Sequence, residues 1–132
     1  VDYAGREEVD TSDASCVELP MAVLVNEDSY SAAEFFAAAL QEYEWATIVG
    51  SQTYGKGNFQ TAFYLSDGSM VNLSIGKYYT PSGKSLSETG VTPDVVVDLD
   101  DEQYALLYYN ALEQADDPQF QAAIDTLTQK IS

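Results

Sequence analysis

Two residues in this sequence have the types and the spacing of a nucleophile and its general base. Ser31 stands where a helix is expected to begin, and Lys56 lies between Gly55 and Gly57. Glycines on both sides of the lysine permit close backbone approach. The chain has only five basic residues against 22 acidic ones, which indicates that a lysine in this position is more than a generic surface charge. We therefore interpret Ser31 as a candidate nucleophile and Lys56 as a candidate general base.

The composition removes the competing catalytic chemistries. The chain contains no histidine, so a Ser-His-Asp triad, a histidine zinc site and a Cys-His protease are all excluded. Cys16 is the only cysteine, which excludes an intrachain disulfide. A serine hydroxyl still needs a base, and the remaining choices are a carboxylate, a lysine or the terminal amine. Lysine acts as a base only when neutral, and burial favours that form. Gln60 could orient the amine through its carbonyl oxygen.

Simpler interpretations of the same residues stay open. Residues 31–34 read Ser-Ala-Ala-Glu, the spacing of a capping box, so Ser31 could be only a helix cap. Lys56 could be only a surface charge. Ser29, in the turn before the helix, is a competing nucleophile. A helix amino terminus after a buried strand is nevertheless a favourable place for a developing oxyanion.

The loop at residues 50–57 is also close to a phosphate-binding P-loop. A P-loop requires serine or threonine where Gly57 stands, and it must lead into a helix. Residues 58–64 are rich in aromatic and β-branched types, which favours a strand. The sequence thus predicts no nucleotide site in this loop.

Charge and hydropathy narrow the classes of molecule that this chain could bind. A formal net charge of -17 argues against nucleic acid or an anionic membrane as a partner. No apolar run reaches the roughly 20 residues of a membrane span. The acidic residues from position 94 to 117 are typical of a solvated face that aids solubility. We expect no metal and no cofactor.

The elements that must position Ser31 and Lys56 form a βαβ unit. Residues 21–25 are a continuous apolar run, which predicts a strand buried on both faces. From Ser31 the spacing changes to that of an amphipathic helix of about three turns, with apolar residues at 32, 35, 36, 39 and 40. Residues 46–49 predict a second buried strand, parallel to the first. Ligand chemistry in such sheets gathers at the carboxyl ends of the strands.

The rest of the chain predicts a hairpin and two helices. Strands are expected at 59–65 and 70–75 around a turn at 66–68, with an extension through 77–80, a turn at 81–83 and a last short strand at 95–97. Helices are expected at about 101–114 and 118–130. Residues 1–20 read as a loop or a weak edge strand. The 132 residues are enough for one α/β domain with its own core.

Several stretches, in order, resemble one family, the C-terminal processing peptidases, also called tail-specific proteases. The match runs from about residue 20 to 99. It is carried by Gln60 and by VLVN at 23–26, SYSAAE at 29–34, IVG at 48–50, TYGKG at 53–57, LSDGS at 65–69, KYYTPSG at 77–83 and GVTPD at 90–94. The ordered set is much more specific than any one of its motifs.

The resemblance implies a serine-lysine dyad. It places the nucleophile on Ser31, not Ser29, the lysine on Lys56 and the supporting glutamine on Gln60. One oxyanion donor would be the backbone amide of Ala32. Tyr30 departs from the alanine usual before the nucleophile.

The resemblance also implies a fold and a context. The fold would be an α/β core like those of the crotonase-like and ClpP-like peptidases. Residues 1–132 would be the carboxyl-terminal part of the catalytic domain, with an upstream segment and a PDZ domain outside this chain. Substrates would be polypeptides cleaved near their carboxyl ends, and the location would be extracytoplasmic or cell-envelope associated. The alternative is a noncatalytic ligand- or peptide-binding module on the same fold, as in the interphotoreceptor retinoid-binding proteins.

Overall fold

A three-stranded parallel sheet forms the centre of the molecule. The computed structural model describes residues 1–7, 9 and 11–131. Strand β1 (Met21–Val25) pairs with β2 (Ala46–Gly50), and β2 pairs at its carboxyl end with the short β5 (Val95–Val96). The order is β1-β2-β5, so β2 is the central strand. The predicted parallel βαβ unit is confirmed.

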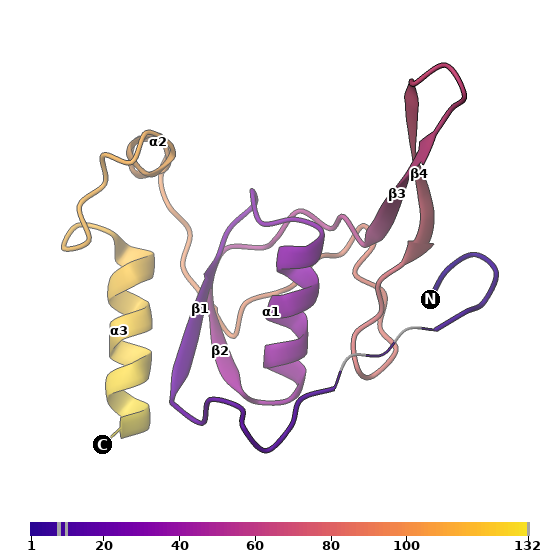
Figure 1. Cartoon of the computed structure of the whole chain (residues 1–132). Helices are drawn as coiled ribbons and strands as arrows, with labels where there is room; N and C mark the ends of the chain where they lie inside the picture. The colour runs from indigo at the N-terminus through magenta and orange to yellow at the C-terminus, as the bar shows by residue number, and fades with distance from the viewer. Residues whose placement is uncertain (8, 10, 132) are drawn as a thin grey trace.

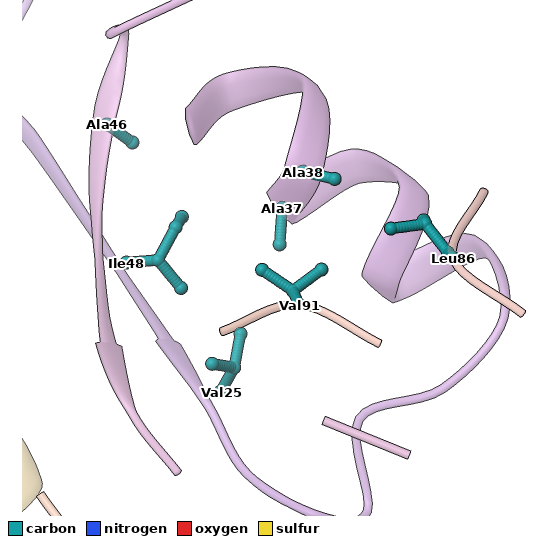
Figure 2. Packing of buried hydrophobic residues seen from close by; sticks show 7 residues of the cluster. All are labelled: Val25, Ala37, Ala38, Ala46, Ile48, Leu86 and Val91. Carbon is teal, nitrogen blue, oxygen red and sulfur yellow. The ribbon is translucent and has the colours of Figure 1, made fainter. Parts of the chain in front are cut away.

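Two helices cover the two faces of this sheet (Figure 1). Helix α1 (Ala32–Glu42) packs on β2, and α3 (Pro118–Ile131) packs on β1 and β2 from the other side. Figure 2 shows the core beneath α1, where Ala37 and Ala38 of the helix lie beside strand residues such as Ile48 and beside Leu86 and Val91 from later loops. Its buried members are Val25, Ala37, Ala38, Ala46, Ile48, Leu86 and Val91.

A β-hairpin stands apart from the sheet and helices (Figure 1). Strand β3 (Asn58–Tyr64) pairs antiparallel with β4 (Met70–Lys77), as the sequence predicts to within a few residues. The amino-terminal segment meets the base of the hairpin, where Asp2 bridges Gly76. This contact agrees with the predicted weak edge, although positions 8 and 10 of that segment lie outside the described residues. Among the described residues, no helix is long and apolar enough to span a membrane.

The burial of β1 and α1 corrects two expectations. Strand β1 is half-buried instead of buried on both faces, because it lies at the edge of the sheet while β2 holds the centre. The fully buried residues of α1 are Glu34, Ala37 and Ala38. Of the predicted apolar set, Phe35 and Leu40 pack against the core while partly buried, whereas Phe36 is 61% exposed. The small alanine side chains allow the helix to approach β2 closely. The packing gained in this way outweighs the burial that larger apolar side chains would provide.

Helix α2 (Asp101–Tyr108) is shorter than the predicted 101–114. The helix ends where Asn110 adopts a positive φ of 54°. The amide of Asn110 then donates to the oxygen of Leu107, and that of Ala111 to the oxygen of Leu106. This is the Schellman arrangement, which satisfies the last helix carbonyls and turns the chain away. The final helix, α3, lies where the sequence predicts it.

Candidate active site

The turn between β1 and α1 uses one of its two serines structurally. The hydroxyl of Ser29 accepts a hydrogen bond from the amide of Asn26 at 3.1 Å and lies 3.4 Å from the Asn26 side-chain oxygen. These bonds, with the amide of Ser29 donating to the backbone oxygen of Asn26, close the turn. The Ser29 hydroxyl is therefore occupied in holding the turn, which favours Ser31 as the reactive serine.

Ser31 has an unusual backbone conformation at the entrance to α1. Its φ of 60° and ψ of -122° belong to a region that non-glycine residues rarely adopt, at a cost on the order of 1–3 kcal/mol. Such strain persists only where neighbours hold it, and it is frequent at active sites. The contact from the Glu34 amide toward the Ser31 hydroxyl has the arrangement of a capping box but is not a full side-chain cap hydrogen bond. Among the described residues, no hydrogen bond donated by the Ser31 hydroxyl is found.

The amide of Ala32 lies directly after the candidate nucleophile. Ala32 is exposed and is the first residue of α1, where backbone amides have no partner within the helix. No hydrogen bond from this amide is found among the described residues. The positive end of the helix dipole adds to the attraction of this position for an anion.

Glu34 joins the serine to the lysine loop. Its side chain is 0% exposed, and its two carboxylate oxygens accept four hydrogen bonds. Oε2 accepts from the backbone amides of Ser31 and Lys56, both at 2.9 Å. Oε1 accepts from the Thr53 hydroxyl at 2.5 Å and from the Gly55 amide at 2.6 Å. One buried carboxylate therefore fixes the backbones of both candidate catalytic residues.

The glycines around Lys56 serve the close approach that the sequence predicts. A Cβ on Gly57 would lie 2.4 Å from the backbone nitrogen of Ser87. Gly55 has a φ of +89°, and a Cβ there would lie 3.0 Å from the carbonyl carbon of Glu88. The oxygen of Gly55 also accepts from the Glu88 amide at 2.8 Å. The segment at 87–88 thus packs directly on the lysine loop, and side chains at either glycine would displace it.

The Lys56 amine lies against an aromatic ring. Its Nζ is 5.5 Å from the centroid of the Tyr30 ring, a cation–π arrangement. The described residues contain no hydrogen bond between Lys56 Nζ and Ser31 Oγ. Gln60 is exposed on β3, beside a β-bulge between Phe59 and Gln60, and its Nε2 donates to Ser74 Oγ at 3.5 Å. The structure thus joins the Ser31 and Lys56 backbones through Glu34, while the Gln60 side chain is directed to β4.

Sequence reasoning missed the structural role of Thr53 and understated that of Glu34. Glu34 was recognisable only as the fourth residue of a capping box. Thr53 is buried, donates to Glu34 and accepts from the Val91 amide at 2.7 Å. Its signal was weak because a threonine before a glycine-rich loop is common. The P-loop alternative fails as predicted, because the loop after β2 leads into strand β3.

A polar cavity of about 250 Å³ lies at the same carboxyl end of the sheet. Its lining includes Glu27 after β1, Ser51 after β2 and Tyr104 from α2. The Tyr104 hydroxyl donates to Asp28 Oδ2 at 2.6 Å, and this hydrogen bond is the main reason that the pKa of Tyr104 rises to about 12. Helix α2 is thereby attached to the turn that precedes Ser31.

Comparison with known proteins identifies the family. Residues 2–97 match the sequence model of peptidase family S41. A carboxyl-terminal-processing protease of Synechocystis sp. is 37% identical over 129 residues, covering 97% of this chain and 29% of that protein. A carboxy-terminal-processing protease of Bartonella bacilliformis is 47% identical over 81 residues, covering 61% of this chain and 19% of that protein.

A solved structure agrees with this assignment. The photosystem II D1 C-terminal processing protease superposes with a TM-score of 0.57 at 37% identity, covering 76% of this chain and 26% of that one. The α/β fold expected from the sequence is therefore confirmed. The chain spans less than a third of the length of each of these three proteins. With most of its sequence matched to the family model, this chain belongs to peptidase family S41.

Proposed function

We propose that this chain carries the catalytic dyad of a serine endopeptidase, with Ser31 as nucleophile and Lys56 as general base. Neutral Lys56 Nζ takes the proton of Ser31 Oγ while the oxygen attacks the carbonyl carbon of a peptide bond. The ammonium then gives this proton to the leaving nitrogen, the C–N bond breaks, and an acyl-enzyme ester remains. Water attacks the ester, its proton passing to the amine. The carboxylic acid leaves, and Ser31 regains its proton.

The observation that carries this proposal is the clamp formed by Glu34. Its Oε2 holds the backbone amides of Ser31 and Lys56 at the same distance, 2.9 Å, although the two residues come from different connections of the sheet. A helix cap alone needs no bond to a distant loop. In the proposal, Glu34 holds both backbones in place while side-chain rotation brings Oγ and Nζ together.

Two further residues take supporting roles in the proposal. The Ala32 amide is proposed to donate to the oxyanion that forms beside Ser31. Gln60 is proposed to accept a hydrogen bond from the Lys56 amine once that amine turns toward Ser31. The present bond of Gln60 to Ser74, at 3.5 Å, is long and easily exchanged.

The proposed substrates are polypeptides cleaved near exposed carboxyl ends. This follows the names of the relatives, which are carboxyl-terminal-processing proteases. We propose that residues 1–132 supply the carboxyl-terminal part of a catalytic domain, consistent with the fraction of each relative that they cover. An extracytoplasmic or envelope location is proposed from the family resemblance, and fractionation of cells that produce the full-length protein checks it.

Substitution of the two dyad residues in the full-length parent protein tests the function. With an unstructured polypeptide as substrate, Ser31→Ala and Lys56→Ala should each reduce kcat by at least about a thousandfold, since dyad members act as a unit. Both variants should keep the wild-type circular dichroism spectrum, because neither side chain is fully buried.

Matched controls make the result specific. Ser29→Ala should retain much of the activity, because its hydroxyl only stabilises the turn. Lys130→Ala, near the end of α3, should leave the rate unchanged. Cleavage that survives in Lys56→Ala would reject the dyad. A wild-type protein that binds peptides without cleaving them would support the binding-module alternative instead.

A further inference from the structure

Tyr30 places an aromatic ring directly beside the candidate dyad. It precedes Ser31 in the chain, and its ring lies 5.5 Å from Lys56 Nζ. A second ring, that of Tyr54, meets Tyr30 edge to face at a centroid distance of 6.3 Å. The amide of Tyr54 donates to the oxygen of Ser29 at 3.1 Å, which holds the two loops together. The Tyr30 ring thus lies between the Tyr54 ring and the Lys56 amine.

Among the residues that the structure describes, no carboxylate forms an ion pair with the Lys56 amine. The chain has 22 acidic residues, yet the ion pair found among the described residues is that of Arg6 with Asp2. The nearby Glu34 carboxylate is already filled by four donors, and none of them is the amine. In the described part of the chain, the interaction found for the Lys56 amine is therefore its cation–π contact with the Tyr30 ring.

The ring and the serine require different states of the same amine. A cation–π contact attracts the ammonium, whereas proton abstraction from Ser31 requires the neutral amine within about 3 Å of Oγ. The recorded arrangement is of the first kind, since Nζ makes no hydrogen bond to Ser31 Oγ. In the placement against the ring, Nζ makes no hydrogen bond to Ser31 Oγ, so attraction to the ring favours this placement over the catalytic one.

We propose that Tyr30 is a positioning residue that holds the Lys56 amine away from Ser31 and so lowers the rate of proteolysis. The inference rests on the proposed dyad and goes beyond it by assigning a role to the residue before the nucleophile. A cation–π contact at a partly exposed ring corresponds to a population change of roughly two- to fivefold. The ring is 55% exposed, so its substitution does not disturb the core.

Rate measurements with three substitutions test the proposal in the full-length parent protein. Tyr30→Leu and Tyr30→Ala should each raise kcat at saturating substrate by roughly two- to fivefold, because both remove the ring. Tyr30→Phe should match the wild type, because it keeps the ring and removes only the hydroxyl. Unchanged kcat in the Leu and Ala variants, or a Phe variant that behaves like them, would overturn the proposal.

A spectroscopic measurement separates this proposal from the proposed function. This chain contains four lysines, and the side-chain methylene signal that is lost in Lys56→Arg belongs to Lys56. The Lys56 signal, assigned with Lys56→Arg, should show an upfield ring-current shift in the wild type and in Tyr30→Phe. The shift should disappear in Tyr30→Leu, and a signal indifferent to that substitution would refute the contact. Retained cleavage in Ser31→Ala would refute the proposed function instead, whatever the NMR result.

Discussion

Replacing Glu34 with glutamine should destabilise the chain by about 2 to 4 kcal/mol. The glutamine side chain can take two orientations that differ by exchange of its oxygen and nitrogen. In the less costly one, its nitrogen replaces Oε1 and faces Thr53 and Gly55, and the Thr53 hydroxyl can turn to accept a hydrogen bond from it. The Gly55 amide then loses its acceptor, which costs about 1 to 3 kcal/mol for a buried donor. The bonds from the Ser31 and Lys56 amides become neutral, and each weakens by about 1 kcal/mol. Glutamine costs less to bury than a carboxylate, which offsets part of the loss.

Urea unfolding measures this prediction directly. The midpoint for Glu34→Gln should fall while the slope with denaturant stays constant, since the same surface is exposed on unfolding. Glu44→Gln is the matched control, because Glu44 is exposed in the turn just after the same helix and should change stability by less than about 0.5 kcal/mol. Hydrogen exchange should also quicken at the amides of Gly55 and Lys56. Equal midpoints for the two variants would refute the role of Glu34 as a clamp.

Three further predictions concern the framework of the site. Gly90→Ala should cost about 2 to 4 kcal/mol in the same urea assay, because Gly90 has a φ of +62° and the new Cβ would lie 2.6 Å from a backbone oxygen; wild-type stability would contradict this. Ile48→Ala should cost about 2 to 5 kcal/mol since Ile48 is 0% exposed, whereas Ile131→Ala, at 73% exposure, should change little; similar losses would count against the described core. The hydrogen bond to Asp28 raises the pKa of Tyr104 above its usual 10.0 to about 12, so its stabilisation is complete below pH 10 and is lost as the pH rises toward 12. Absorbance titration of Tyr104→Phe should lack one phenol that ionises near pH 12, and the loss of one that ionises near pH 10 instead would be inconsistent with this bond.

The sequence was a good guide to the elements of the fold because their signals are local. The apolar runs at 21–25 and 46–49, the helix between them and the hairpin around residues 66–68 each depend on neighbouring residues. The errors occurred where tertiary contacts decide. In helix α1 the fully buried positions are alanines and Glu34, because close packing on β2 and three donors from the lysine loop outweigh the burial of larger apolar side chains. Helix α2 ends early because Asn110 adopts a positive φ.

The candidate site could be predicted only in part for the same reason. The serine at the start of α1 and the lysine between glycines are visible as residue types, and the structure does bring their backbones to one carboxylate. Three of the four partners of Glu34 come from a loop about 20 positions away, which no local pattern reveals. The position of the Lys56 amine over Tyr30 depends on side-chain geometry and likewise has no sequence signature.

Covalent labelling tests the central claim, the reactivity of Ser31, most directly. A fluorophosphonate probe phosphonylates a serine that an adjacent base activates, with loss of fluoride. In the full-length parent protein, peptide mapping should place the adduct on Ser31, and Lys56→Ala should label far more slowly than the wild type. An adduct on Ser29, or labelling of Ser31 at the same rate without Lys56, would contradict the dyad.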